Sequence, residues 1–313
     1  MGPPPLTKAQ LPHSCSISGA PCAPVRPIKL TALALLLALL PVSTARAQAT
    51  SASAPDNQNP IISFLEQWDE RALRAQQDQP NWLTPVVTST ARLKQEVRYD
   101  ITWQRNPDGS TTETYGGSRG FTTIPVSRVE ISVNLPPYIV HNEPKSRDGF
   151  GDFSVLSKFR MASANRSHGD YALTMFLNIT FPTGSYKNGS PHPVITPTFA
   201  GGKGFGNFVY QGTFGADLPG AQANILGRRL IQNNALQYRG LGKIWPELEV
   251  NSNFYKQCPN DGKKQVSLTP GISAGRFPLY KHLTLTAAAG VEIAVTHFHT
   301  STHQTVFSLR LPF

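Results

Sequence analysis

The sequence predicts an all-β protein, a transmembrane antiparallel β-barrel of about 12 strands with a short N-terminal amphipathic helix. Three observations lead to this fold class. A secretory signal opens the sequence, and the segment 301–313 alternates apolar with mostly polar residues up to Phe313. From Pro85 onward, alternation with a period of two replaces helical periodicity. Because a closed sheet has no unpaired edge, a secreted chain of this kind is able to cross an outer membrane with strands.

The first 47 residues are predicted to be a leader and secretory signal peptide. Arg26 and Lys29 precede an apolar run over 30–40, and the small residues at both ends of 45–47 give a cleavage pattern near Ala47. The run is about 11 residues long, whereas a transmembrane helix needs about 20. The sequence therefore predicts export, cleavage and insertion into the bacterial outer membrane by strands.

Residues 48–84 are predicted to hold a linker and an amphipathic helix. Residues 48–60 are rich in Ala, Ser, Gln, Asn and Pro, which is typical of a linker. Pro60 suits the first turn of a helix that runs to about Gln79, and Pro80 ends it. Such a helix needs an apolar partner, which is the barrel mouth, the membrane surface or another protein. It serves either as a structural cap or as a plug of the lumen. Its apolar residues recur at helical spacing: Ile61, Phe64, Leu65, Trp68 and Leu73.

The barrel is predicted over residues 85–313. In its clearest strand, Leu173, Met175 and Leu177 alternate with Thr174 and Asn178. Other segments alternate apolar residues with charges, as expected when one face contacts lipid and the other contacts water. The predicted strands are 91–105, 111–122, 125–136, 150–162, 170–181, 193–201, 204–217, 228–240, 243–256, 264–276, 281–297 and 301–313.

The connections between these strands predict the orientation of the barrel. Outer-membrane barrels have long outer loops and short periplasmic turns, and here both termini would face the periplasm. The short connections are 123–124, 202–203 and 241–242. The long ones are rich in Pro, Gly, Asn and Asp: 137–149, 182–192, 218–227 and 257–263.

A series of short motifs over residues 82–313 adds a family resemblance. The motifs are Trp82-Leu83-Thr84-Pro85-Val86-Val87, Leu135-Pro136-Pro137-Tyr138, Gly149-Phe150-Gly151-Asp152, Pro182-Thr183-Gly184, Trp245-Pro246-Glu247-Leu248-Glu249-Val250-Asn251, Leu268-Thr269-Pro270-Gly271 and Gly275-Arg276-Phe277-Pro278. Their order and spacing resemble the meta-pathway phenol-degradation family of bacterial outer-membrane β-barrel proteins. The resemblance implies a transporter-like barrel and supplies no catalytic motif. It also implies that Phe313 ends a strand read by the outer-membrane assembly machinery.

The alternation assigns candidate residues to the lumen of the barrel. Charges of both signs on one inner wall either lock together as a plug or line a hydrated path. We expect passage or uptake of small solutes of unknown identity, with aromatic or hydrophobic ones among them. The alternatives are a non-conducting structural or interaction barrel of the cell envelope and, more distantly, an outer-membrane lipid-acting enzyme. The lumen-lining candidates are Arg98, Asp100, Glu130, Asp152, Lys158, Arg160, Asn178, Glu247, Glu249 and Arg276.

Other functional signals in the sequence are weak. His297, His299 and His303 lie in or beside the last outer loop, with His297 and His299 expected on one strand face, and imidazole is able to bind transition metals. A solvent-facing loop is the simpler interpretation, so no metal site and no cofactor are predicted. No nucleophile-elbow pattern is present, which argues against an enzyme. The net charge of +10 suits contact with outer-membrane lipid and lipopolysaccharide, whereas scattered basic residues without a motif argue against nucleic-acid binding.

Overall fold

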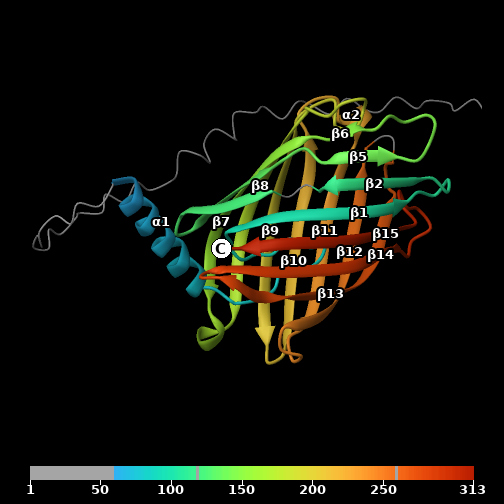
Figure 1. Cartoon of the computed structure of the whole chain (residues 1–313). Helices are drawn as coiled ribbons and strands as arrows, with labels where there is room; N and C mark the ends of the chain where they lie inside the picture. The colour runs from blue at the N-terminus through green and yellow to red at the C-terminus, as the bar shows by residue number, and fades with distance from the viewer. Residues whose placement is uncertain (1–59, 118–119, 258–259) are drawn as a thin grey trace, which may run out of the picture. The chain divides into compact units, whose positions relative to one another are not determined.

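The computed structural model describes residues 60–117, 120–257 and 260–313. The predicted signal peptide over 1–47 and the linker up to residue 59 lie outside these residues. The described chain begins with α1 (Pro60–Gln77) and continues into an antiparallel sheet that closes on itself (Figure 1). None of the described helices is long and apolar enough to cross a membrane.

The wall is a closed barrel of 12 antiparallel strands, which confirms the predicted fold class. The last strand pairs with the first over ten residues, from Glu96 opposite Pro312 to Arg105 opposite His303, and this pairing closes the barrel. Nine strands are unbroken: β1 (Glu96–Arg105), β8 (Tyr171–Phe181), β9 (Val194–Phe205), β10 (Phe208–Pro219), β11 (Arg228–Tyr238), β12 (Ile244–Lys256), β13 (Lys264–Tyr280), β14 (Leu283–Ala294) and β15 (His303–Pro312).

The second, third and fourth strands of the wall are each broken in two. One ladder contains β2 (Thr111–Gly116), β5 (Tyr138–His141) and β6 (Gly149–Phe150), and the other contains β3 (Phe121–Val126), β4 (Val129–Asn134) and β7 (Phe153–Ala164). β1 pairs with β3 through its first two residues and with β2 through its last six.

The sequence predicted two unbroken strands, over 111–122 and 125–136, where the wall is broken. Gly116 and Gly117 have φ values of +98° and +50°, which turn the chain out of the strand. Pro136 and Pro137 follow β4 and have no N–H to donate to a ladder. The glycines thus end β2 of the first ladder, and the prolines separate β4 of the second ladder from β5 of the first.

The two ends of the barrel differ in their connections. Two-residue turns join β3 to β4, β9 to β10 and β13 to β14, at residues 127–128, 206–207 and 281–282. The short 3₁₀ helix η2 (Arg166–His168) lies in the turn between β7 and β8 at this same end. The opposite end carries the long loops, including 220–227, which holds α2 (Ala223–Leu226). The turn predicted at 202–203 is four residues too early, because the Gly-rich residues there continue β9.

The wall is inverted relative to that of a soluble protein. In β1, Glu96, Arg98 and Asp100 are 3%, 4% and 7% exposed, whereas Val97 and Tyr99 are 44% and 49% exposed. A soluble protein would bury the apolar residues of such a strand and expose the charges. Charged residues on the inner face and exposed apolar residues on the outer face are expected where the outer face contacts lipid.

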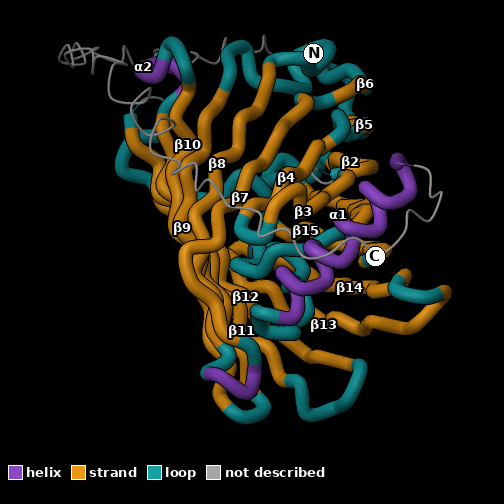
Figure 2. Tube along the Cα trace, turned by 90° about the vertical axis from the view of Figure 1, so that its left-hand side faces the viewer, coloured by secondary structure: helices purple, strands orange, loops and turns teal. Residues whose placement is uncertain are grey.

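α1 lies at the end of the barrel that carries the short turns. The Nε1–H of Trp68 donates to the carbonyl of Ile124 in β3 at 2.9 Å, and Ala72 and Ala75 pack with Ile124 and Leu93. Figure 2 views this end and shows α1 running across it, close to the C-terminus. The helix therefore covers the mouth, as one of the two predicted arrangements requires, and a different segment enters the lumen.

Candidate functional site

Residues 79–95 join α1 to β1 inside the barrel, and we call them the lumen segment. The segment has no helix or strand. Its apolar side chains Trp82, Val86 and Leu93 are almost completely buried. Buried backbone groups without secondary structure need other partners, and here the polar inner wall provides them.

Two glutamates of β12 hold the middle of the lumen segment. Oε1 of Glu247 accepts the backbone N–H of Val86 at 2.8 Å. The two carboxylate oxygens of Glu249 accept the N–H groups of Val87 and Thr88 at 2.8 and 2.6 Å. Hydrogen bonds to a carboxylate are shorter and stronger than those between neutral groups. The lumen segment is thus tied to the wall by two carboxyl groups of β12.

Two arginines bind the carbonyl groups of the same part of the lumen segment. Arg310 in β15 donates to the carbonyls of Thr84 and Pro85, at 2.8 Å for Pro85. Arg98 in β1 donates to the carbonyl of Val86 at 2.9 Å. The backbone between residues 84 and 88 is therefore held by acceptors from β12 and by donors from β15 and β1.

Several predicted lumen charges form ion pairs with each other. Arg98 lies 2.8 Å from Asp100, and Lys158 lies 2.9 Å from Glu130. Lys158 also donates to the carbonyl of Thr90 at 3.3 Å. Of the two outcomes expected for an inner wall of mixed charge, these residues form the locked one.

Arg160 and Asp152 anchor elements at the two ends of the barrel. The guanidinium of Arg160 donates to the carbonyl of Ala75 in α1 at 2.5 Å and to that of Ser127 at 2.8 Å. The carboxylate of Asp152 accepts the N–H groups of Gly184 and Ser190 at 2.8 and 2.6 Å, which fixes the loop after β8.

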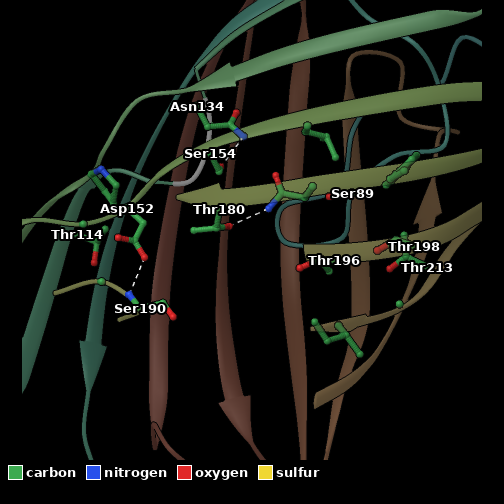
Figure 3. Close-up of a pocket in the computed structure, with 18 of the residues that line it drawn as sticks. Ser89, Thr114, Asn134, Asp152, Ser154, Thr180, Ser190, Thr196, Thr198 and Thr213 are labelled. Atoms are coloured by element: carbon green, nitrogen blue, oxygen red, sulfur yellow. Dashed lines mark hydrogen bonds between the residues drawn. The ribbon is translucent and has the colours of Figure 1, made fainter. Parts of the chain in front are cut away.

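A cavity of about 600 Å³, which we call the outer chamber, occupies the lumen on the side of the long loops. Most of the residues that line it are serines, threonines and asparagines, and Figure 3 shows several of them around the cavity. Phe176, Leu156 and Ile231 add an apolar surface. Of the described residues that line the chamber, only Asp152 is ionisable, and its carboxylate is engaged by the loop. The polar lining includes Ser89, Thr114, Asn134, Ser154, Asn178, Thr180, Thr196, Thr198, Thr213 and Asn233.

A second cavity, of about 220 Å³, lies on the α1 side of the lumen segment, and we call it the inner cavity. Arg92, Lys94, Arg276 and Arg310 line it, together with the carboxylate of Glu96. Burial lowers the pKa of Lys94 to about 7, against the opposing attraction of Glu96. The lumen thus has an outer chamber with little charge and an inner cavity rich in positive charge, with the lumen segment between them.

The three histidines of the predicted loop, His297, His299 and His303, line neither cavity, whereas Phe313 lies at the edge of the inner one. β14 ends at Ala294, so the expectation that His297 and His299 share a strand face is wrong, and both lie in the loop before β15. Within the described ranges, no group of three or more His, Cys, Asp or Glu is placed to hold a metal ion. Phe313 lines the inner cavity and stacks on Phe121, with ring centroids 5.9 Å apart.

The sequence reasoning missed the lumen segment, although one signal was present. The barrel wall begins at Glu96 and not at Pro85 as predicted, and the stretch from Pro80 to Thr90 has neither a helical nor a strand period. A stretch without a period is typical of a loop. Some of its wall partners are distant in sequence: Gln211, which donates to the carbonyl of Leu83 at 3.0 Å, lies 128 residues away.

Comparisons with known proteins identify a family and similar solved structures. The family described as "Putative MetA-pathway of phenol degradation" matches residues 85–298. The crystal structure of the COG4313 outer membrane channel from Pseudomonas putida F1 is similar, with a TM-score of 0.51 and 13% identity over 74% of this chain and 100% of that one. The NanC porin gives a TM-score of 0.44 and 8% identity over 70% and 98% of the two chains. No curated protein matches the sequence.

Proposed function

This chain belongs to the family described as "Putative MetA-pathway of phenol degradation", and on that premise we propose that it is an outer-membrane channel for small solutes with an apolar or aromatic body. The observation that carries the proposal is the outer chamber. It is a cavity of about 600 Å³ inside a wall whose outer face is apolar. A barrel that serves only as a structural element has no need for such a chamber.

The lining of the outer chamber supports solutes that combine a polar group with an apolar body. Serine, threonine and asparagine side chains offer hydrogen bonds without a fixed charge, and Phe176, Leu156 and Ile231 offer apolar contact. A site with convergent polar groups on an apolar surface is typical of small-molecule binding. The aromatic part of the proposal rests on Phe176 and on the family description.

The lumen segment controls passage in this proposal. It separates the outer chamber from the inner cavity and is held by Glu247, Glu249, Arg98 and Arg310. Partial release of the segment from these residues would join the two cavities into one path. We therefore expect a channel that is mostly closed and opens in brief events.

Single-channel recording on residues 48–313, refolded and inserted into a planar bilayer, tests the proposal. Discrete conductance steps of low open probability are the expected result. Folding is checked separately by circular dichroism and by the change in gel mobility on heating. A folded, inserted barrel that gives no steps would refute the channel and favour a non-conducting barrel of the cell envelope.

A further inference from the structure

We infer that the inner cavity binds a small organic anion, a carboxylate attached to a compact apolar body. The inference deepens the proposed function and rests on it only for the role of the site in passage, because it names the class of solute. Binding itself can be measured whether or not the barrel conducts.

The lining of the inner cavity carries an excess of positive charge. Arg92, Arg276 and Arg310 contribute three guanidinium groups, and Glu96 contributes one carboxylate. Lys94 adds only part of a charge at neutral pH, because burial lowers its pKa to about 7. A concave site lined by one sign of charge attracts ligands of the opposite sign.

Two of these cations share an uncharged hydrogen-bond acceptor. Lys94 pairs with Glu96. Arg92 and Arg276 both donate to a single carbonyl, that of Trp82, at 2.8 Å for Arg276. A carbonyl accepts a hydrogen bond but carries no net charge, so these bonds do not neutralise the two guanidinium groups. The lining therefore retains a positive field toward the cavity.

The guanidinium groups beside the cavity crowd together. Arg92 is 7% exposed and lies near Arg276. Burial and the nearby charge of Arg276 lower the pKa of Arg92, as expected where positive charges crowd together. A carboxylate bound in the cavity would supply the missing negative charge.

The remaining lining is mixed. Leu73 of α1, Leu83, Pro312 and Phe313 supply apolar contact, and Gln76, Asn81, Gln95 and His282 supply polar groups. The side chain of Trp82 is completely buried, with its indole N–H donating to Asp170 at 2.9 Å, so it adds no surface to the cavity. A volume of about 220 Å³ limits the ligand to a single small ring or a short chain.

Benzoate and phenol are the matched probes for this site. They share one aromatic ring and differ in that benzoate is an anion at neutral pH. Isothermal titration of refolded residues 48–313 in a zwitterionic detergent should show saturable binding of benzoate, with phenol bound at least about tenfold more weakly. High salt should weaken the binding of benzoate and leave that of phenol unchanged.

Arg276→Gln removes one of the cations, and Lys281→Gln is its control. Lys281 is exposed in the adjoining turn and does not line the cavity, but its replacement changes the net charge by the same amount. We expect Arg276→Gln to weaken benzoate binding about tenfold, Arg276→Lys to restore part of it, and Lys281→Gln to have no effect.

Three results would overturn the inference: no saturable benzoate binding, equal binding of phenol and benzoate, or equal effects of Arg276→Gln and Lys281→Gln. The titrations on the unaltered chain decide the matter even if a variant fails to fold. Benzoate binding by a barrel without conductance would retain the site and reject the channel. Conductance without benzoate binding would retain the channel and reject the site.

Discussion

Glu249→Gln should release the lumen segment and raise the open probability of the barrel. Glu249 is completely buried, and its two oxygens accept the N–H groups of Val87 and Thr88. Glutamine has one side-chain oxygen, so one N–H loses its acceptor and the other exchanges a charged acceptor for a neutral one. A hydrogen bond to a charged group contributes about 1.5–3 kcal/mol, and a neutral one about 1 kcal/mol.

These values set the expected size of the effect. Loss of one charged bond and weakening of the other gives roughly 2–5 kcal/mol. Relief of repulsion with Glu247, two residues away on the same strand face, offsets part of this cost. We therefore expect about 2 kcal/mol, which at 1.4 kcal/mol per factor of ten corresponds to an increase of about 30-fold in the ratio of open to closed states.

Single-channel recording measures this ratio directly, and Glu292→Gln is the matched control. Glu292 lies in β14, is partly buried, and hydrogen bonds to Ser267 of the neighbouring strand. The control removes the same charge from the wall without removing an acceptor of the lumen segment. An unchanged open probability in Glu249→Gln, or an equal rise in Glu292→Gln, would refute the reasoning.

Three further predictions concern the same segment and the helix. Gly202→Ala should raise the open probability, because a Cβ there would lie 2.7 Å from the Trp82 ring. Gly201→Ala is the control and should leave the open probability unchanged, because its Cβ would meet only Leu173 and a carbonyl at ordinary contact distances. Lys94 has a pKa of about 7 in the docked segment and about 10.5 in the released one, so the released segment binds more protons between these two pH values. Docking of the segment should therefore strengthen, and the open probability should fall, as the pH rises above about 7. Lys94→Met should abolish this pH dependence. Arg160→Gln should speed tryptic cleavage of α1, because it removes the donor to the Ala75 carbonyl; an unchanged cleavage rate would show that α1 is held by other contacts.

The fold was largely predictable because its main signal is local. The alternation over 170–181, 228–240 and 243–256 predicts β8, β11 and β12 to within two residues at each end. Alternation also indicates which residues face inward, since Arg98, Glu130, Lys158 and other predicted lumen residues are buried in the structure. Neither inference needs knowledge of which strands are neighbours.

The contents of the lumen were not predictable in the same way. Thr88 and its acceptor Glu249 are 161 residues apart, and the contact depends on the curvature of the closed wall. Arg160 and Asp152 alternate correctly, but their partners come from α1 and from the loop after β8, which no strand period locates. The broken wall escaped prediction because the separation of its two ladders depends on which strands pair.

The position of Arg310 links the formation of the barrel to the capture of its contents. Arg310 belongs to the last strand, and it binds carbonyls of Thr84 and Pro85 that precede the first strand by about a dozen residues. When β15 pairs with β1, the same event brings Arg310 onto the lumen segment. Closure of the wall and the last contacts of the lumen segment are therefore coupled: a barrel that is not closed between β15 and β1 lacks the two donors of Arg310 that hold Thr84 and Pro85.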